Sequence, residues 1–201
     1  MSASLVGSEM CIRDRSDPGQ NNIFHVEQHG DPLALNDLQR RQFVPAPIQP
    51  TGYWAKAGDV LTVEYVLSGN TPTDAPQIWI HCIVEGSAPA QEYYSDKQKV
   101  PLTVGVNKIS VAQTGVVYIA SNNIPDPAVN MQITLVSGGN LMPTFVLGRD
   151  DANAKQWLQD VAQAVSKNTS PYAELVGKRM IITLPIHEIK GNVTDPVAIL
   201  N

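Results

Sequence analysis

Apolar and polar residues alternate along much of the chain. The alternation is cleanest in Leu61–Leu67 and Val129–Leu135, where every second residue is apolar. A period of two predicts strands with one buried face. Shorter runs predict four further strands, at Ile78–Val84, Val106–Val111, Val116–Ala120 and Pro143–Leu147. Several short strands separated by turn residues are typical of two packed sheets, so we predict a mainly β fold, an antiparallel β-sandwich over residues 50–149.

The pattern changes to a helical period after the sandwich. Apolar residues from Ala154 to Val165 recur three and four positions apart, which predicts one amphipathic helix. Asp150 or Asp151 is expected to cap its start by accepting hydrogen bonds from free backbone N–H groups, and Asn168–Pro171 to end it. A further strand is predicted over Met180–Ile186. Residues 150–193 are therefore interpreted as a helix-strand connection.

The last residues predict a helix that has barely begun. In Thr194-Asp195-Pro196, Asp195 suits the cap position and Pro196 the first helical position. A helix of about five residues is not stable by itself. Residues 194–201 are therefore interpreted as the start of a second domain, within which the chain is truncated.

The first residues carry little sign of regular structure. Leu5–Arg15 resembles, over eleven consecutive positions, the translated sequence of a sequencing-library adapter, so residues 1–16 are set aside as an artefact. Residues 17–49 are expected to form an irregular lead-in, with a short helix from Asp31 or Asn36.

Composition narrows the range of functions. Hydrophobic residues make up 43% of the 201 residues and charged residues 16%, enough for a folded core. Lys and Arg (14) against Asp and Glu (19) give a net charge of -5, which argues against a nucleic-acid partner. The apolar runs are far shorter than the roughly 18 residues of a membrane helix, so no membrane span is expected. Without residues 1–16, Cys82 is the one cysteine, and a single cysteine does not reveal the redox compartment.

Five segments form an ordered set along the chain. They are PTGYWAKAGDVLTVEY (Pro50–Tyr65), GVVYIAS (Gly115–Ser121), PTFVLGRDD (Pro143–Asp151), SPYAELVGKRMIITLP (Ser170–Pro185) and DPVAIL (Asp195–Leu200). Together they resemble the enhancin-like family of zinc metallopeptidases, peptidase family sixty. The resemblance implies that this chain is the non-catalytic β-sandwich immediately upstream of a zinc-bearing catalytic domain. Residues 194–201 would be the start of that catalytic domain, which is truncated here. It also implies a secreted or cell-surface enzyme whose partners are that downstream domain and the mucin-type glycoproteins it cleaves.

The chain departs from this family at the catalytic motif. Such peptidases carry HExxH on a helix, where the two His bind one zinc and the Glu polarises the attacking water. The His-Glu pair of this sequence is His187-Glu188, with Gly191 where the second His would stand, and it is predicted to lie at the end of a strand. We therefore expect no catalytic residue, metal ligand or cofactor in this chain, which would be inactive alone, and zinc in the missing catalytic domain.

A second pair of histidines has the spacing of metal ligands. His25 and His29 are four residues apart in HVEQH and would share one face of a helix. Glu27 lies two residues from each, so neither HExxH nor its inverse is present, and no apolar stripe would hold a helix there. Adventitious metal binding or none is the expected outcome.

A different class of function is a carbohydrate-binding or adhesion module without protease activity. Sandwich glycan binders present exposed aromatic side chains, and Trp54 and Trp79 are candidates, although packing is the expected role of most aromatics in a small sandwich. Tyr93 and Tyr94 lie in a polar stretch and are the first choice for a glycan surface. Since fold-level analogy is a weak basis for function, a purely structural or protein-interaction domain also stays open.

Overall fold

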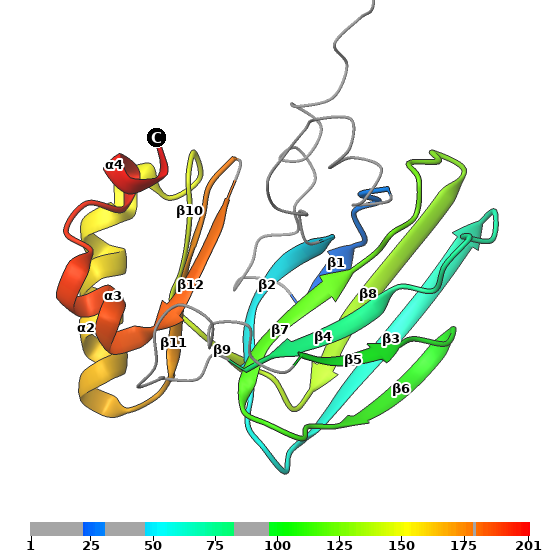
Figure 1. Ribbon diagram of the computed structural model, residues 1–201, viewed down its shortest axis with the longest axis horizontal. Helices are drawn as coiled ribbons and strands as arrows, with labels where there is room; N and C mark the ends of the chain where they lie inside the picture. The colour runs from blue at the N-terminus through cyan, green and yellow to red at the C-terminus, as the bar shows by residue number, and fades with distance from the viewer. Residues whose placement is uncertain (1–21, 31–46, 83–96, 179) are drawn as a thin grey trace, which may run out of the picture.

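The computed structural model describes residues 22–30, 47–82, 97–178 and 180–201, which form a β-sandwich and a smaller lobe of strands and helices (Figure 1). The four-stranded sheet contains, in spatial order, β1 (Ile23–His25), β8 (Val129–Ser137), β3 (Val60–Gly69) and β6 (Gly105–Ser110). The five-stranded sheet contains β5 (Lys97–Pro101), β4 (Gln77–His81), β7 (Gly115–Ala120), β2 (Ile48–Ala55) and β9 (Asn140–Leu141). Neighbouring strands are antiparallel throughout both sheets, which confirms the predicted sandwich.

Alternate side chains of the strands form the sandwich core. In β3, Val63 and Tyr65 are buried, whereas the intervening Glu64 is exposed. Val63 lies opposite Leu135 of β8, so the apolar sides of the two strands coincide. Full burial of a side chain of this size stabilises the fold by about 1.5–3 kcal/mol, and the predicted alternation is therefore the main source of stability.

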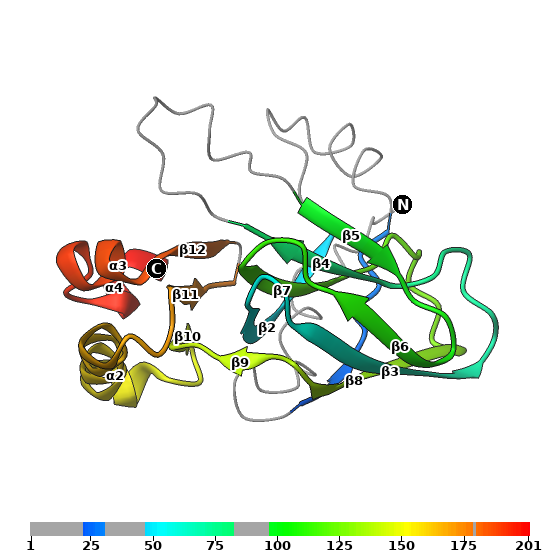
Figure 2. The ribbon, with the colours of Figure 1, turned by 90° about the horizontal axis from the view of Figure 1, so that it is seen from below.

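A third sheet and the helices form the smaller lobe. Its strands are β10 (Thr144–Val146), β11 (Tyr172–Val176) and β12 (Ile181–Pro185); β10 is parallel to β11, and β12 is antiparallel to it. The helices are η1 (Asp151–Asn153), α2 (Ala154–Lys167), α3 (Ile186–Asn192) and α4 (Pro196–Leu200). Figures 1 and 2 show this sheet between the helices and the sandwich. No helix within the described ranges has the length and apolar character that crossing a bilayer requires.

Strand β7 is buried on both sides, because the third sheet covers the outer face of the sandwich. Val117 and Ile119 point into the sandwich core. Val116 and Tyr118 point the other way and pack with Met142 and Tyr172 of the smaller lobe. The helices bury the opposite side of the third sheet in a core of their own. The sandwich and the smaller lobe therefore pack directly against each other, with the third sheet between the five-stranded sheet and the helices.

The predicted helix is confirmed as α2, with Trp157, Val161 and Ala164 buried along one stripe. The prediction that Asp150 or Asp151 caps it is wrong. The residue at the cap position of α2 is Asn153, whose side chain makes no capping hydrogen bond. The η1 turn separates the two aspartates from α2, and their carboxylates accept hydrogen bonds from the backbone of the preceding turn instead.

Two other expectations also differ from the structure. Within the lead-in expected to be irregular, Ile23–His25 forms strand β1, and Phe24 is fully buried in the sandwich core. The Pro143–Leu147 run was assigned to the sandwich, yet β10 pairs with β11 of the third sheet. Both are short segments, whose pairing partners a run of apolar residues does not identify. The helix expected from Asp31 or Asn36 lies outside the described residues.

Candidate functional site

A shallow groove lies where β9 and β10 approach the start of α2, and its volume is about 390 Å³. One side is apolar and the other is formed by polar side chains of the helix. The lining residues are Leu141, Met142, Pro143, Thr144, Arg149, Asp150, Asn153, Gln156, Trp157 and Asp160. Trp157 is 6% exposed, and its indole nitrogen makes no hydrogen bond.

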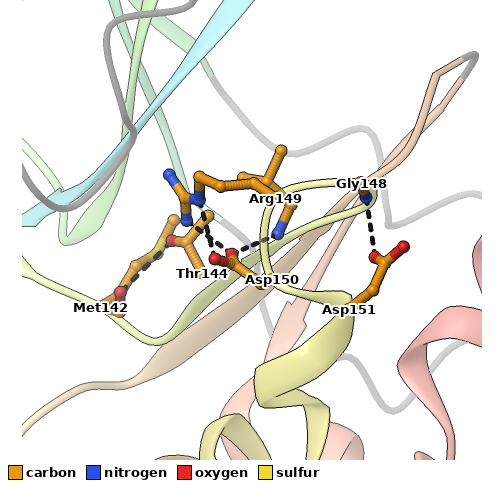
Figure 3. Close-up of polar contacts among 7 residues, drawn as sticks. Met142, Thr144, Gly148, Arg149, Asp150 and Asp151 are labelled. Carbon is orange, nitrogen blue, oxygen red and sulfur yellow. Dashed lines mark hydrogen bonds and ion pairs between the residues drawn. The ribbon is translucent and has the colours of Figure 1, made fainter.

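The tight turn that follows β10 forms one end of this groove (Figure 3). Gly148 has a φ of +89°, a conformation that favours glycine. The Asp150 carboxylate accepts a hydrogen bond of 2.8 Å from the backbone N–H of Val146, and the Asp151 carboxylate accepts one of 2.7 Å from Gly148. The Arg149 guanidinium binds the Asp150 carboxylate through two nitrogens, at 2.8 and 2.6 Å. The two aspartates of the GRDD sequence therefore stabilise the turn by accepting hydrogen bonds from its backbone N–H groups.

The groove presents carboxylate, amide and guanidinium groups that can form hydrogen bonds with a polar ligand. Its described lining residues include the carboxylates of Asp150 and Asp160 but no histidine, cysteine or serine. The Asp150 carboxylate is already engaged by Arg149 and by the backbone of the turn. A nucleophile activated by a neighbouring base, which covalent catalysis requires, is not present among these residues.

A buried polar cluster joins the smaller lobe to the sandwich. Glu174 of β11 is 0% exposed, and its Oε1 accepts hydrogen bonds from the hydroxyl of Tyr118 of β7 (2.9 Å) and from Thr183 of β12 (2.8 Å). The hydroxyls of Tyr118 and Thr183 are themselves 2.6 Å apart. Burial raises the pKa of Tyr118 well above its ordinary value of 10, and the negative charge of Glu174 raises it further. No local sequence pattern predicts this cluster, since its members are far apart in the chain.

The histidines singled out in the sequence do not come together. His187 lies in the first turn of α3 and not at a strand end, because Pro185 ends β12 and Ile186 and Ile189 turn inward on a helix. His187 is half-exposed, 3.7 Å from its neighbour Glu188. His25 belongs to β1, whereas His29 follows in an irregular segment, 3.5 Å from Glu27. Among the described residues, no group of three His, Cys, Asp or Glu side chains is placed to hold a metal ion.

The two tryptophans proposed as glycan contacts lie on the outer face of the five-stranded sheet. Trp54 of β2 and Trp79 of β4 are half-buried and pack against the cluster that joins the two lobes. The Trp79 indole donates a hydrogen bond of 2.8 Å to Gln77. The ammonium groups of Lys99 and Lys97 lie over the Trp79 ring, 4.3 and 5.5 Å from its centroid.

These two lysines were not among the candidate residues expected from the sequence. Their period-two spacing in KQKVP would have indicated that they share one face of a strand. Tyr93 and Tyr94 lie outside the described residues.

No protein family model matches the sequence, and no curated protein matches it either. Solved structures do match. They include the catalytic module of the metalloprotease ZmpA from Clostridium perfringens, with a TM-score of 0.71 and 16% identity over 87% of this chain and 36% of that chain. The M60 catalytic domain of ZmpC from C. perfringens, in complex with the sialyl T antigen, has a TM-score of 0.66 and 16% identity over 87% of this chain and 36% of that chain.

A third structure contains the M60 catalytic domain of C. perfringens ZmpB with its CBM51-1 and CBM51-2 domains, and matches with a TM-score of 0.69 and 18% identity over 89% of this chain and 20% of that chain. The chain therefore shares its fold with a part of M60 metallopeptidase catalytic modules, and it spans about a third or less of these matched structures. The counterpart of the sandwich lies inside a chain described as a catalytic module, whereas the sequence interpretation placed it ahead of the catalytic domain.

Proposed function

We propose that this chain is the non-catalytic β-sandwich part of a secreted, enhancin-like zinc metallopeptidase that acts on mucin-type glycoproteins. The observation that carries the proposal is the likeness of nearly the whole chain to about a third of an M60 catalytic module, combined with the lack of HExxH in the 201-residue sequence. The chain would support the zinc-bearing part of the enzyme and help to present the substrate to it.

The residues that the structure describes do not fit a catalytic zinc. Such a site needs three protein ligands, usually His with a carboxylate, and an open position for water. His187 is followed by Gly191 in place of a second His, and no suitable group of three ligands exists among the described residues. Zinc would supply the water activation of the whole enzyme from residues outside this chain, so no step of peptide hydrolysis is assigned to it.

Reading the gene beyond the codon for Asn201 is the most direct test. An HExxH motif in the same reading frame would support the proposal, and a complete reading frame without it would overturn the metallopeptidase role. A second test uses the 201-residue chain itself, measured for bound zinc by mass spectrometry and for cleavage of a mucin glycoprotein. One equivalent of zinc together with cleavage, both lost in the His187→Ala variant, would overturn the non-catalytic assignment.

The alternative function is a carbohydrate-binding module without a protease. The half-buried Trp79 ring beneath two lysines favours this alternative more than any other described feature. The two functions separate in the gene: a binding module needs no downstream HExxH, whereas the metallopeptidase does.

A further inference from the structure

Two lysines of the edge strand β5 hold their charges over one aromatic ring of the neighbouring strand. Trp79 and Lys99 are paired across β4 and β5, and His81 and Lys97 are the next pair on the same face. The alternating positions of both strands therefore bring the four side chains together, in a ribbon (QIWIH and KQKVP) that contains no acidic residue. In a chain with a net charge of -5, the described residues of this edge ribbon are thus cationic.

The two ammonium groups have no carboxylate partner among the residues that the structure describes. Neither lysine makes an ion pair within the part of the chain that the structure describes, and their described contact is with the Trp79 ring. Partial burial lowers the pKa of Lys97, and the positive charge of Lys99 lowers it further. Two like charges over one ring repel each other, and an anion between them would relieve that repulsion.

Two polar side chains of β4, Gln77 and His81, lie beside Trp79 on the same face as the lysines. His81 has its Nε2 buried without a hydrogen-bond partner, next to Lys97. Burial lowers the pKa of His81, and the positive charge of Lys97 lowers it further. The hydrogen bond from Trp79 to Gln77 fixes the orientation of the indole. The depression of about 260 Å³ beside Lys97 belongs to the opposite side of β5, where the Gln98 amide is hydrogen-bonded to the backbone of Ser110 and Ala112.

We propose that Trp79, Lys97 and Lys99 form a binding site for an anionic saccharide, one that bears a carboxylate or a sulfate group. The ammonium groups would hold the anion by charge-assisted hydrogen bonds, and the indole would contact the sugar ring. A sugar fits these features better than an acidic peptide does, because the surface is only two lysines wide and includes an aromatic ring. The inference rests on the proposed function, in which the substrate is a glycoprotein, and places an acidic sugar of that substrate on the sandwich.

Binding of defined probes to the 201-residue chain tests this site. The probes are 3′-sialyllactose, lactose 3′-sulfate and neutral lactose, titrated by NMR while the indole N–H signal of Trp79 is followed. We expect at least one acidic sugar to bind about tenfold more tightly than lactose, since two charge-assisted contacts are lost with the neutral sugar. Whichever acidic probe binds more tightly identifies the anionic group as carboxylate or sulfate.

The variants separate the site from general charge. The Lys97→Gln, Lys99→Gln chain should lose the preference for acidic sugars, and the Lys97→Arg, Lys99→Arg chain should keep it and so verify that the strand tolerates substitution. A matched control removes the same charge elsewhere, at two exposed lysines, as Lys56→Gln, Lys108→Gln, and should bind as the wild type does.

Four results would overturn the proposal: no binding of either acidic sugar by the folded chain, equal affinity for lactose, an equal loss in the control, or tighter binding of a hexaglutamate peptide. None of these results depends on zinc or on a downstream HExxH motif, so a failure here is distinct from a failure of the metallopeptidase role.

Discussion

The hydroxyl of Tyr118 is the most informative single group to remove from this protein. It donates a 2.9 Å hydrogen bond from the sandwich to the fully buried carboxylate of Glu174 in the smaller lobe. The Tyr118→Phe substitution deletes one oxygen atom and leaves the packing of the ring, which is 2% exposed, in place. The carboxylate would keep its 2.8 Å hydrogen bond from Thr183 but lose one donor in a site that water does not reach.

The expected cost follows from the kind of hydrogen bond that is lost. Hydrogen bonds to charged groups contribute about 1.5–3 kcal/mol, and a buried acceptor left with fewer donors is costly. We therefore expect Tyr118→Phe to lower the free energy of unfolding by about 2 kcal/mol, measured by urea denaturation at pH 7. Thr183→Val should have a similar effect, and the double variant should cost less than the sum, because the two hydroxyls also contact each other at 2.6 Å.

Tyr65→Phe provides the matched control. The Tyr65 hydroxyl is also buried, but it makes no hydrogen bond, so its removal should leave stability unchanged or slightly raised. Equal effects of Tyr118→Phe and Tyr65→Phe on the unfolding free energy would refute the idea that the Glu174 cluster stabilises the junction between the lobes.

The same residue predicts a dependence on high pH. Because burial raises the pKa of Tyr118 above 10, the unfolded chain releases this proton first as the pH rises. The stability that depends on the neutral phenol is complete below pH 10 and is lost as the pH rises through the folded-state pKa, by up to about 1.4 kcal/mol per pH unit. The Tyr118→Phe chain should therefore show a shallower loss of stability above pH 10 than the wild type, and parallel curves would contradict the assignment.

Three further predictions concern other parts of the molecule. Gly69→Ala should lower the free energy of unfolding, measured in urea, by at least about 2 kcal/mol, since φ at Gly69 is +83° and a Cβ would lie 2.0 Å from a backbone oxygen. The control is Gly58→Ala, where φ is +88° and the space is open, and it should cost about 1 kcal/mol. Equal losses of stability in the two variants would exclude a contribution from the clash. Lys97→Gln should raise the pKa of His81 in an NMR titration yet leave it below 6.5, because burial is the larger cause of the lowering. Since His81 takes up its proton at a higher pH in the unfolded chain than in the folded chain, the stability should fall as the pH drops below about 6.5. The fall should be less steep in Lys97→Gln than in the wild type. An unchanged pKa of His81 in this variant would contradict the effect of the Lys97 charge. Asp150→Ala should cost about 1–3 kcal/mol, because the backbone N–H of Val146 loses its acceptor and Arg149 loses one ion pair. A thermal midpoint equal to that of the wild type would show that the turn does not depend on Asp150.

Much of the secondary structure could be predicted from local pattern. The alternation in Leu61–Leu67 and Val129–Leu135 marks β3 and β8, and the stripe from Ala154 to Val165 marks α2. Asp195 caps α4 as predicted, with its carboxylate accepting from the N–H groups of Val197 and Ala198 at 3.0 Å each. These features are local, because each depends on residues that are only a few positions apart in the sequence.

The errors and omissions share a different cause. Strand β10 pairs with β11 across the whole length of α2, and β1 pairs with β8, more than a hundred positions away. A short apolar run has the same appearance whichever sheet it joins, so its partner is decided by loop closure and by which apolar surface remains uncovered. His187 was misplaced for a related reason: Ile186 continues the alternation of β12 and also begins the buried face of α3.

The order of amino acids by itself determined which segments are extended, which are helical and which faces are apolar, because periodicity and end-capping act within a few residues. Tertiary structure alone decided that Glu174 is buried beneath Tyr118 and that two lysines share the ring of Trp79. Burial, pKa and proximity depend on the side chains that fold against a group from distant parts of the chain. The chemistry of this protein therefore depends on packing that no stretch of its sequence encodes alone.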